Sequence, residues 1–220
     1  MNRYRSMDKK ELLRRILVLM AGNILIGAGI ALFKTSAFGN DPHSAMMLTF
    51  AEKTGTTFSI CFYVASAVYF VAELIWARDL IWIGTFINWF FAGYFSDFFM
   101  AILEKVFPDP LLGVRIGILS VGLLVVSLGI SMYQTSDLGV GPYDTLAIIL
   151  DRKLPWKYFW CRILTDGICA LAAILLGSFG THVGLGTLLS AFGLGPFIAF
   201  FTEKVAVKLV GVSSGNAGRN

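Results

Sequence analysis

Charged side chains are scarce in this chain. Only 15% of the 220 residues are Asp, Glu, Lys or Arg, whereas 56% are hydrophobic, and the mean hydropathy is +0.73. Soluble domains carry about a quarter charged residues, so the composition excludes a water-soluble globular protein. About six crossings of roughly 20 residues each would use the available length. We therefore expect a single all-α integral membrane domain over residues 1–220.

Cysteine and histidine are also rare. The three cysteines lie in apolar stretches without C-x-x-C spacing, and the two histidines are far apart in the sequence. This pattern argues against a disulfide framework and a metal centre. The motifs H-E-x-x-H and G-x-S-x-G, a Walker lysine motif and the recognised nucleic-acid-binding modules are missing as well. We expect no enzyme, no cofactor and no nucleic-acid partner. The expected partners are membrane lipids and a small-molecule substrate, with a homo-oligomer left open.

Long apolar runs occupy most of the chain. Each is long enough to cross a bilayer, and they cover residues 13–33, 57–77, 80–103, 114–134, 157–177 and 183–206. No A-x-A cleavage signal follows the basic N-terminal segment, so we expect an uncleaved first span. With the N-terminus inside, most of the 18 Lys and Arg fall on the cytoplasmic side, the exceptions being Lys34, Lys53, Lys105 and Arg115. This asymmetry predicts a membrane protein with both termini in the cytoplasm.

The two halves of the chain repeat each other. Several residues recur 100 positions later: Gly29-Ile30, Thr35-Ser36, Gly39 and Pro42 match Gly129-Ile130, Thr135-Ser136, Gly139 and Pro142. We predict a first repeat over 12–106 and a second over 113–206, each with three spans. An odd number of spans makes the second copy enter the membrane from the opposite side. We therefore expect a 3+3 inverted repeat, which many secondary transporters use.

Each copy also contains a short helix after its first span. Pro42 and Pro142 suit the first turn of half-helices over 42–53 and 142–153, and about ten residues reach half-way through a bilayer. Such helices either lie on the membrane surface or enter the membrane and return. The apolar residues at 45–51 and 146–150 surround the helix instead of forming one stripe, which favours the re-entrant arrangement.

These repeated motifs resemble a known family. The pattern S-x-L/F-G-x-x-P, a short helix, a span and then G-T-x6-7-G is similar to that of the YczE/YitT-type family of bacterial membrane proteins, over roughly residues 20–205. The residues that carry it are Ser36, Phe38, Gly39, Pro42, Gly84, Thr85, Gly93, Ser136, Leu138, Gly139, Pro142, Gly186, Thr187 and Gly195. The run 139–144 is most similar to the YczE branch, whereas Asn40-Asp41 departs from it. The resemblance implies a fold and a transporter-like function without naming a substrate.

The starts of the two half-helices form the candidate substrate site. Helix N-termini attract anionic groups, so paired starts are expected to bind an anionic or zwitterionic group of a substrate. The candidate residues are Asp41, Pro42, His43, Ser44, Pro142, Tyr143, Asp144 and Thr145. Alternatively, the acidic and hydroxyl side chains among them only cap the helices. Asn23 and Asn88, in the middle of spans, either contact substrate or join helices.

Three charged residues inside the spans are candidates for ion coupling. Asp166 lies near the centre of its span, where an ionised side chain is costly, and Arg162 precedes it by four residues on the same helix face. The two form either a local ion pair or a proton or cation site. Asp97 is the third candidate, with headgroup contact as the alternative, and we expect Glu73 at the membrane interface.

Together with the resemblance to a bacterial family, these features predict a secondary transporter of a small polar or charged metabolite in the bacterial inner membrane. A passive channel for a small solute and a non-transporting accessory or scaffold protein are the alternatives, because two half-helices could equally line a static pore and because no motif identifies a substrate.

Overall fold

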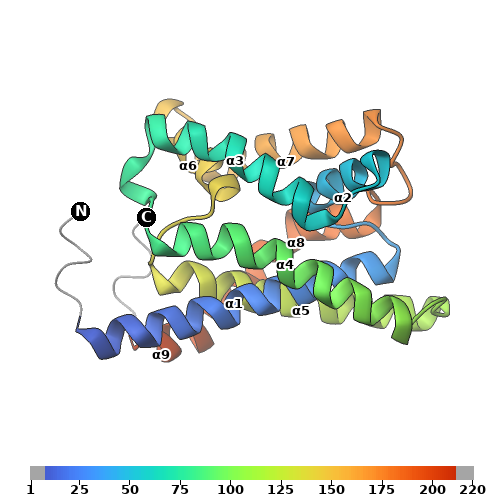
Figure 1. Cartoon of the computed structure of the whole chain (residues 1–220), viewed down its shortest axis with the longest axis horizontal. Helices are drawn as coiled ribbons and strands as arrows, with labels where there is room; N and C mark the ends of the chain where they lie inside the picture. The colour runs from blue at the N-terminus through green and yellow to red at the C-terminus, as the bar shows by residue number, and fades with distance from the viewer. Residues whose placement is uncertain (1–7, 212–220) are drawn as a thin grey trace.

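Helices make up most of the part of the chain that the computed structural model describes, residues 8–211 (Figure 1). In chain order they are α1 (Lys9–Ser36), α2 (Pro42–Thr54), α3 (Phe58–Trp76), the short η1 (Arg78–Leu80), α4 (Ile83–Val106), α5 (Leu112–Ser136), α6 (Pro142–Lys153), α7 (Tyr158–Leu175), α8 (Leu185–Phe201), the π-helical turn η2 (Thr202–Ala206) and α9 (Val207–Val210). The basic residues at positions 3, 5 and 219, on which part of the predicted orientation rests, lie outside the described residues.

Six helical segments are long and apolar enough to cross a membrane. They are α1, α3, α4, α5, α7 and the continuous segment Leu185–Val210. Many large hydrophobic side chains on these helices are exposed, among them Val68 and Phe192. Such a surface is unfavourable in water and suits contact with lipid tails. The prediction of an all-helical fold with six helices able to span a membrane is confirmed for the described residues.

The two short helices also form where the sequence predicts them. α6 has the expected bounds, and α2 extends one residue further than expected, to Thr54. Each begins with proline, whose fixed φ suits the first helical turn. In Figure 1, α2 and α6 lie above the layer of α1, α4 and α5, towards opposite ends of the molecule.

The first helix of each copy packs closely against the other. A Cβ atom added to Gly22 of α1 would stand 2.8 Å from the Gly129 carbonyl oxygen of α5, and one added to Gly129 would stand 2.8 Å from the Gly22 carbonyl oxygen. Small residues let helix backbones approach in this way inside membranes. The repeated glycines therefore place α1 against α5 at the centre of the fold.

Equivalent residues of the two copies make equivalent contacts across the molecule. α2 packs on α7 of the other copy, and α6 packs on α3. The Gly84 N–H donates to the Leu138 carbonyl oxygen at 2.7 Å, and the Gly186 N–H donates to the Phe38 carbonyl oxygen at 2.7 Å. The loop after the first helix of each copy is thus hydrogen-bonded to the start of the last long helix of the other copy.

Two equivalent arginines also form reciprocal hydrogen bonds between the copies. Arg15 Nη1 of α1 donates to the Ser136 carbonyl oxygen at 3.0 Å, and Arg115 Nε of α5 donates to the Ser36 carbonyl oxygen at 2.8 Å. The acceptors are carbonyls at the C-terminal ends of α5 and α1, where unpaired oxygens attract cations.

The turns that lead into α2 and α6 need glycine. Gly39 has φ +99° and Gly139 has φ +114°, a backbone region that other residues rarely adopt. A Cβ atom on Gly39 would also stand 2.6 Å from the Gly184 nitrogen, and one on Gly139 would stand 2.8 Å from Thr85 Oγ1. The recurring glycine therefore serves both the turn and its contact with the other copy.

Candidate functional site

The starts of α2 and α6 meet near the middle of the molecule. His43 and Tyr143, which occupy the same position in the two copies, stack with ring centroids 4.0 Å apart and an interplanar angle of 19°. Two aromatic rings of α3 lie beside the His43 ring, with centroid distances of 5.8 Å for Tyr69 and 5.5 Å for Phe62. The residues after both prolines are therefore brought together, in an aromatic cluster.

Side chains of the protein already bond N–H groups at both helix starts. Asp41 Oδ1 accepts a hydrogen bond of 3.1 Å from the Ser44 N–H, and so Asp41 caps α2. At the start of α6, the Gly141 N–H donates to the Tyr133 hydroxyl. Asp144 does not cap α6 but faces an arginine. Asp41 therefore caps its helix, as the sequence analysis allowed, and Asp144 does not.

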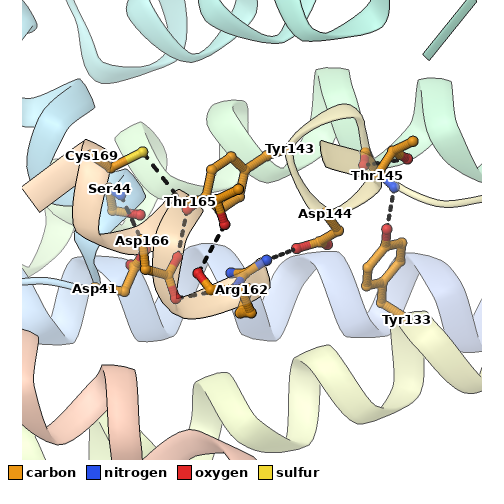
Figure 2. A network of polar contacts seen from close by, with 11 residues as sticks. Asp41, Ser44, Tyr133, Tyr143, Asp144, Thr145, Arg162, Thr165, Asp166 and Cys169 are labelled. Atoms are coloured by element: carbon orange, nitrogen blue, oxygen red, sulfur yellow. Dashed lines mark hydrogen bonds and ion pairs between the residues drawn. The ribbon is translucent and has the colours of Figure 1, made fainter. Parts of the chain in front are cut away.

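Arg162 of α7 lies between two carboxylates (Figure 2). Its Nη1 atom is 2.6 Å from Asp144 Oδ1, and its Nε atom is 3.2 Å from Asp166 Oδ2. The pair of Arg162 and Asp166, which are four residues apart on α7, is therefore present. The contact with Asp144 joins α7 to α6 and depends on the fold.

Tyr143 ties this ion cluster to the aromatic cluster. Its hydroxyl donates to Asp166 Oδ1 at 2.5 Å and lies 3.7 Å from Cys169 Sγ. The Arg162 guanidinium carbon lies 4.7 Å from the centroid of the Tyr143 ring, a cation–π geometry. One tyrosine thus contacts His43 from the first copy and Arg162 and Asp166 from the second.

A cavity of about 100 Å³ opens beside these groups. Its lining combines apolar side chains of α1, α4 and α5 with polar ones: Asp41, His43, Ser44, Ser66, Asn88, Tyr133, Tyr143, Asp144 and Arg162. Two buried atoms of this lining, His43 Nε2 and Ser66 Oγ, have no hydrogen-bond partner among the described residues. Buried polar atoms are nearly always paired, so these two mark a place for a ligand or water.

The two mid-span asparagines join helices. Asn88 Nδ2 donates to Asn23 Oδ1 at 3.0 Å, and Asn23 Nδ2 donates to the Leu19 carbonyl oxygen at 2.9 Å. Asn88 also lines the cavity, whereas Asn23 is completely buried behind it. A Cβ atom at Gly141 would clash with Asn88 Oδ1, so the glycine lets this amide approach the start of α6.

Thr145 of α6 contacts a glutamate on α3, in the other copy. Its hydroxyl lies 3.1 Å from Glu73 Oε1 of α3. Glu73, which the sequence predicts at the membrane interface, has a completely buried side chain, and its Oε2 atom has no partner among residues 8–211. The run around Glu73 gave no signal of this, since the carboxylate is covered by α6 from the other copy.

Asp97 lies apart from the cluster. Its Oδ2 atom accepts a 2.9 Å hydrogen bond from the Ser59 N–H at the start of α3, and Asp97 is not among the residues that line the cavity. It follows Asn88 by nine residues on α4, which corresponds to about 13 Å along the helix. The structure gives Asp97 a capping role.

The outer ends of the half-helices make polar side-chain contacts at the surface. Arg152 of α6 contacts Asp79 at 2.7 Å and 2.8 Å, and this hydrogen bonding lowers the pKa of Asp79. At the outer end of α2, Glu52 Oε2 is 3.0 Å from His182 Nε2. Each half-helix therefore runs from the central cavity to a charged end.

The sequence matches a family of unknown function, DUF6198, over residues 13–203. The chain belongs to this family. Its relatives include the uncharacterized membrane protein YczE of Bacillus subtilis, which is 27% identical over 196 residues covering 87% of each chain. An uncharacterized protein of Haemophilus influenzae is 27% identical over 88% of this chain and 85% of its own, and YyaS of Bacillus subtilis is 24% identical over 77% and 83%. The resemblance to YczE is confirmed. No solved structure matches the chain.

The members of this family named above carry no assigned activity, so the chemistry of the site rests on its own residues. Within residues 8–211, no group of three or more His, Cys, Asp or Glu side chains is placed to hold a metal ion. The cluster contains three carboxylates, one guanidinium, an imidazole and hydroxyl groups around a small cavity. Such an arrangement can bind a small polar molecule and can rearrange by exchange of ion-pair partners.

Proposed function

We propose that this protein is a secondary transporter, not an enzyme, which moves a small polar or charged metabolite across the bacterial inner membrane by alternating access. Its six spans form a 3+3 inverted repeat with both termini in the cytoplasm, and its substrate site is the central cavity. The observation that carries the proposal is the meeting of His43 and Tyr143, equivalent residues of the two copies, beside a cavity that both apolar and polar side chains line.

The reciprocal contacts support the inverted repeat. The hydrogen bonds from Gly84 to Leu138 and from Gly186 to Phe38, like those of Arg15 and Arg115, pair each copy with the other in the same way. Two copies related by a two-fold axis would produce such exchange. Transporters of this design place their substrate between the repeats, at the ends of interrupted helices.

The burial of α2 supports a re-entrant half-helix. Nine of its thirteen residues are buried, including the whole stretch from Pro42 to Thr49. A helix lying on the membrane surface would bury one face and leave the other to water. The exposed polar contacts at the outer ends of α2 and α6 fit helices that start inside the protein and end near the headgroups.

Solute flux tests the proposal. We expect a thermal-shift screen of the purified protein against small metabolites to yield a stabilising ligand, because a ligand that binds only the folded state raises the melting temperature. Proteoliposomes should then accumulate that ligand against its gradient when an ion gradient is applied. Asp144→Asn should reduce this uptake at least tenfold by removing an Arg162 partner, whereas Asp79→Asn, at an exposed ion pair, should not.

The other outcomes separate the alternatives. Equilibration without accumulation, at rates far above those of carriers, would make the protein a channel. Absence of any flux, together with a stable co-purifying protein, would contradict transport and favour a scaffold.

A further inference from the structure

We propose that the central cavity binds a small ammonium ion, a protonated amine of a few non-hydrogen atoms. This inference rests on the proposed function in that it names the substrate class of the same cavity. An ammonium ion differs from the anionic or zwitterionic group that the helix starts alone would predict. Three features of the site favour it: the charge balance, the free acceptor atoms and the occupied donor groups.

The charge balance of the site is negative. Arg162 is matched by Asp144 and Asp166, and Asp41 adds a third carboxyl group next to Asp166 (Figure 2). His43, at the start of α2, is buried against aromatic rings, an environment that disfavours the charged form of an imidazole. One cation therefore faces three carboxyl groups in a site where charges are poorly hydrated. A bound cation would offset this excess.

Two of the residues that line the cavity have a side-chain atom able to accept a further hydrogen bond. His43 Nε2 and Ser66 Oγ are buried and lack a partner in the described part of the chain, and both residues line the cavity. A neutral imidazole presents one acceptor nitrogen, and a hydroxyl presents two lone pairs. The three N–H donors of a primary ammonium group suit these acceptors and a carboxylate.

Several of the groups that would bind an anion already hold partners within the protein. The Ser44 and Gly141 N–H groups at the two helix starts donate to Asp41 and to Tyr133, and Arg162 holds two carboxylates. An anionic ligand would have to displace one of these internal partners. It would also enter a site that already contains excess negative charge.

Size and donor type favour an ammonium ion over larger ligands and metals. A cavity of about 100 Å³ admits only a molecule of a few non-hydrogen atoms. Hard metal cations prefer several oxygen ligands, and residues 8–211 contain no cluster of three His, Cys, Asp or Glu side chains able to provide them. The imidazole nitrogen instead suits an N–H donor.

Asp41 is the counter-charge that a variant can remove without losing the cap of α2. Asparagine caps helix N-termini as well as aspartate does, so Asp41→Asn keeps the fold and removes the charge. Asp97→Asn is the matched control, because Asp97 also accepts a hydrogen bond from a helix-start N–H but lies outside the cavity. Ser66→Ala is a second test, which removes a free acceptor.

Binding of methylammonium to the purified full-length protein tests the inference. We expect methylammonium chloride to raise the melting temperature above that in an equal concentration of sodium chloride, and sodium acetate to have no such effect. Asp41→Asn should weaken the affinity about tenfold or more, as for loss of a charged hydrogen-bond partner. Ser66→Ala should weaken it by a smaller factor, and Asp97→Asn should leave it unchanged.

Two results would overturn the inference. Stabilisation by acetate but not by methylammonium would show an anion site and leave the transporter proposal intact. Undiminished methylammonium binding by both Asp41→Asn and Ser66→Ala would place the cation elsewhere. The transporter proposal itself fails separately, if reconstituted protein moves none of the solutes of the metabolite screen.

Discussion

At the scale of single residues, the site consists of positions where the two copies differ. Asp41 corresponds to Gly141, His43 to Tyr143 and Ser66 to Asp166. The charged members of these pairs join one network, while Gly141 provides room for Asn88 and Ser66 leaves a free hydroxyl. The copies thus supply the same backbone geometry and different chemistry to the two sides of the cavity.

Spacing predicted only part of this network. Arg162 and Asp166 are four residues apart on one helix, and their pair was foreseeable for that reason. The contact of Arg162 with Asp144 and the burial of Glu73 against Thr145 join separate helices. No local pattern encodes such contacts, so neither the pairing of Asp144 with Arg162 nor the burial of Glu73 could be predicted.

Removing the cation of the cluster should destabilise the protein. Arg162→Gln leaves Asp144 and Asp166 without their shared partner in a mostly buried site, and we expect the free energy of unfolding to fall by about 2 kcal/mol. Arg152→Gln is the control, because its pair with Asp79 is exposed and should be worth no more than about 1 kcal/mol. Denaturation of both variants in detergent measures the difference. Equal losses would contradict a central role for Arg162.

At the scale of helices, composition and proline positions were informative. The apolar runs located all six spans, and Pro42 and Pro142 located α2 and α6 to within one residue. The π-helical turn at Thr202–Ala206 was not foreseeable, because it lies inside a run that reads as one continuous span. Hydrophobic runs report length and burial, whereas a change of helix type depends on contacts with α5 and α8.

The close packing of α1 on α5 predicts that Gly22 cannot be replaced by alanine without a loss of stability. In Gly22→Ala the new methyl group would meet the Gly129 carbonyl oxygen at 2.8 Å and the Tyr133 nitrogen at 2.9 Å. Both are backbone atoms, so the helices must separate, and we expect a loss of about 1–3 kcal/mol.

Gly117→Ala on α5 is the matched control for this prediction. No atom lies within 4 Å of the added methyl group, and alanine has a higher helix propensity than glycine, so stability should rise by up to about 1 kcal/mol. Unfolding midpoints of the two variants in detergent provide the measurement. A neutral Gly22→Ala would contradict the close approach of the helices.

At the scale of the whole molecule, the duplication links the fold to the proposed function. Each copy is completed by the other: its turn binds the start of the other copy's last long helix, and its half-helix packs on the other copy's second span. The cavity lies where these exchanged elements meet, so a relative movement of the copies would change it. In the proposed mechanism, this movement opens the cavity to one side of the membrane at a time.

Chemical labelling of a cysteine in the cavity tests this central claim most directly. Ser66→Cys places a thiol at the free hydroxyl, and the parent protein, with Cys161 and Cys169 buried and Cys61 partly exposed, gives the background. When a membrane-impermeant thiol reagent is added to either side of sealed vesicles, alternating access predicts that Ser66→Cys is labelled from each side and that a bound ligand slows the labelling. Labelling from neither side, or from one side only under all conditions, would contradict alternating access.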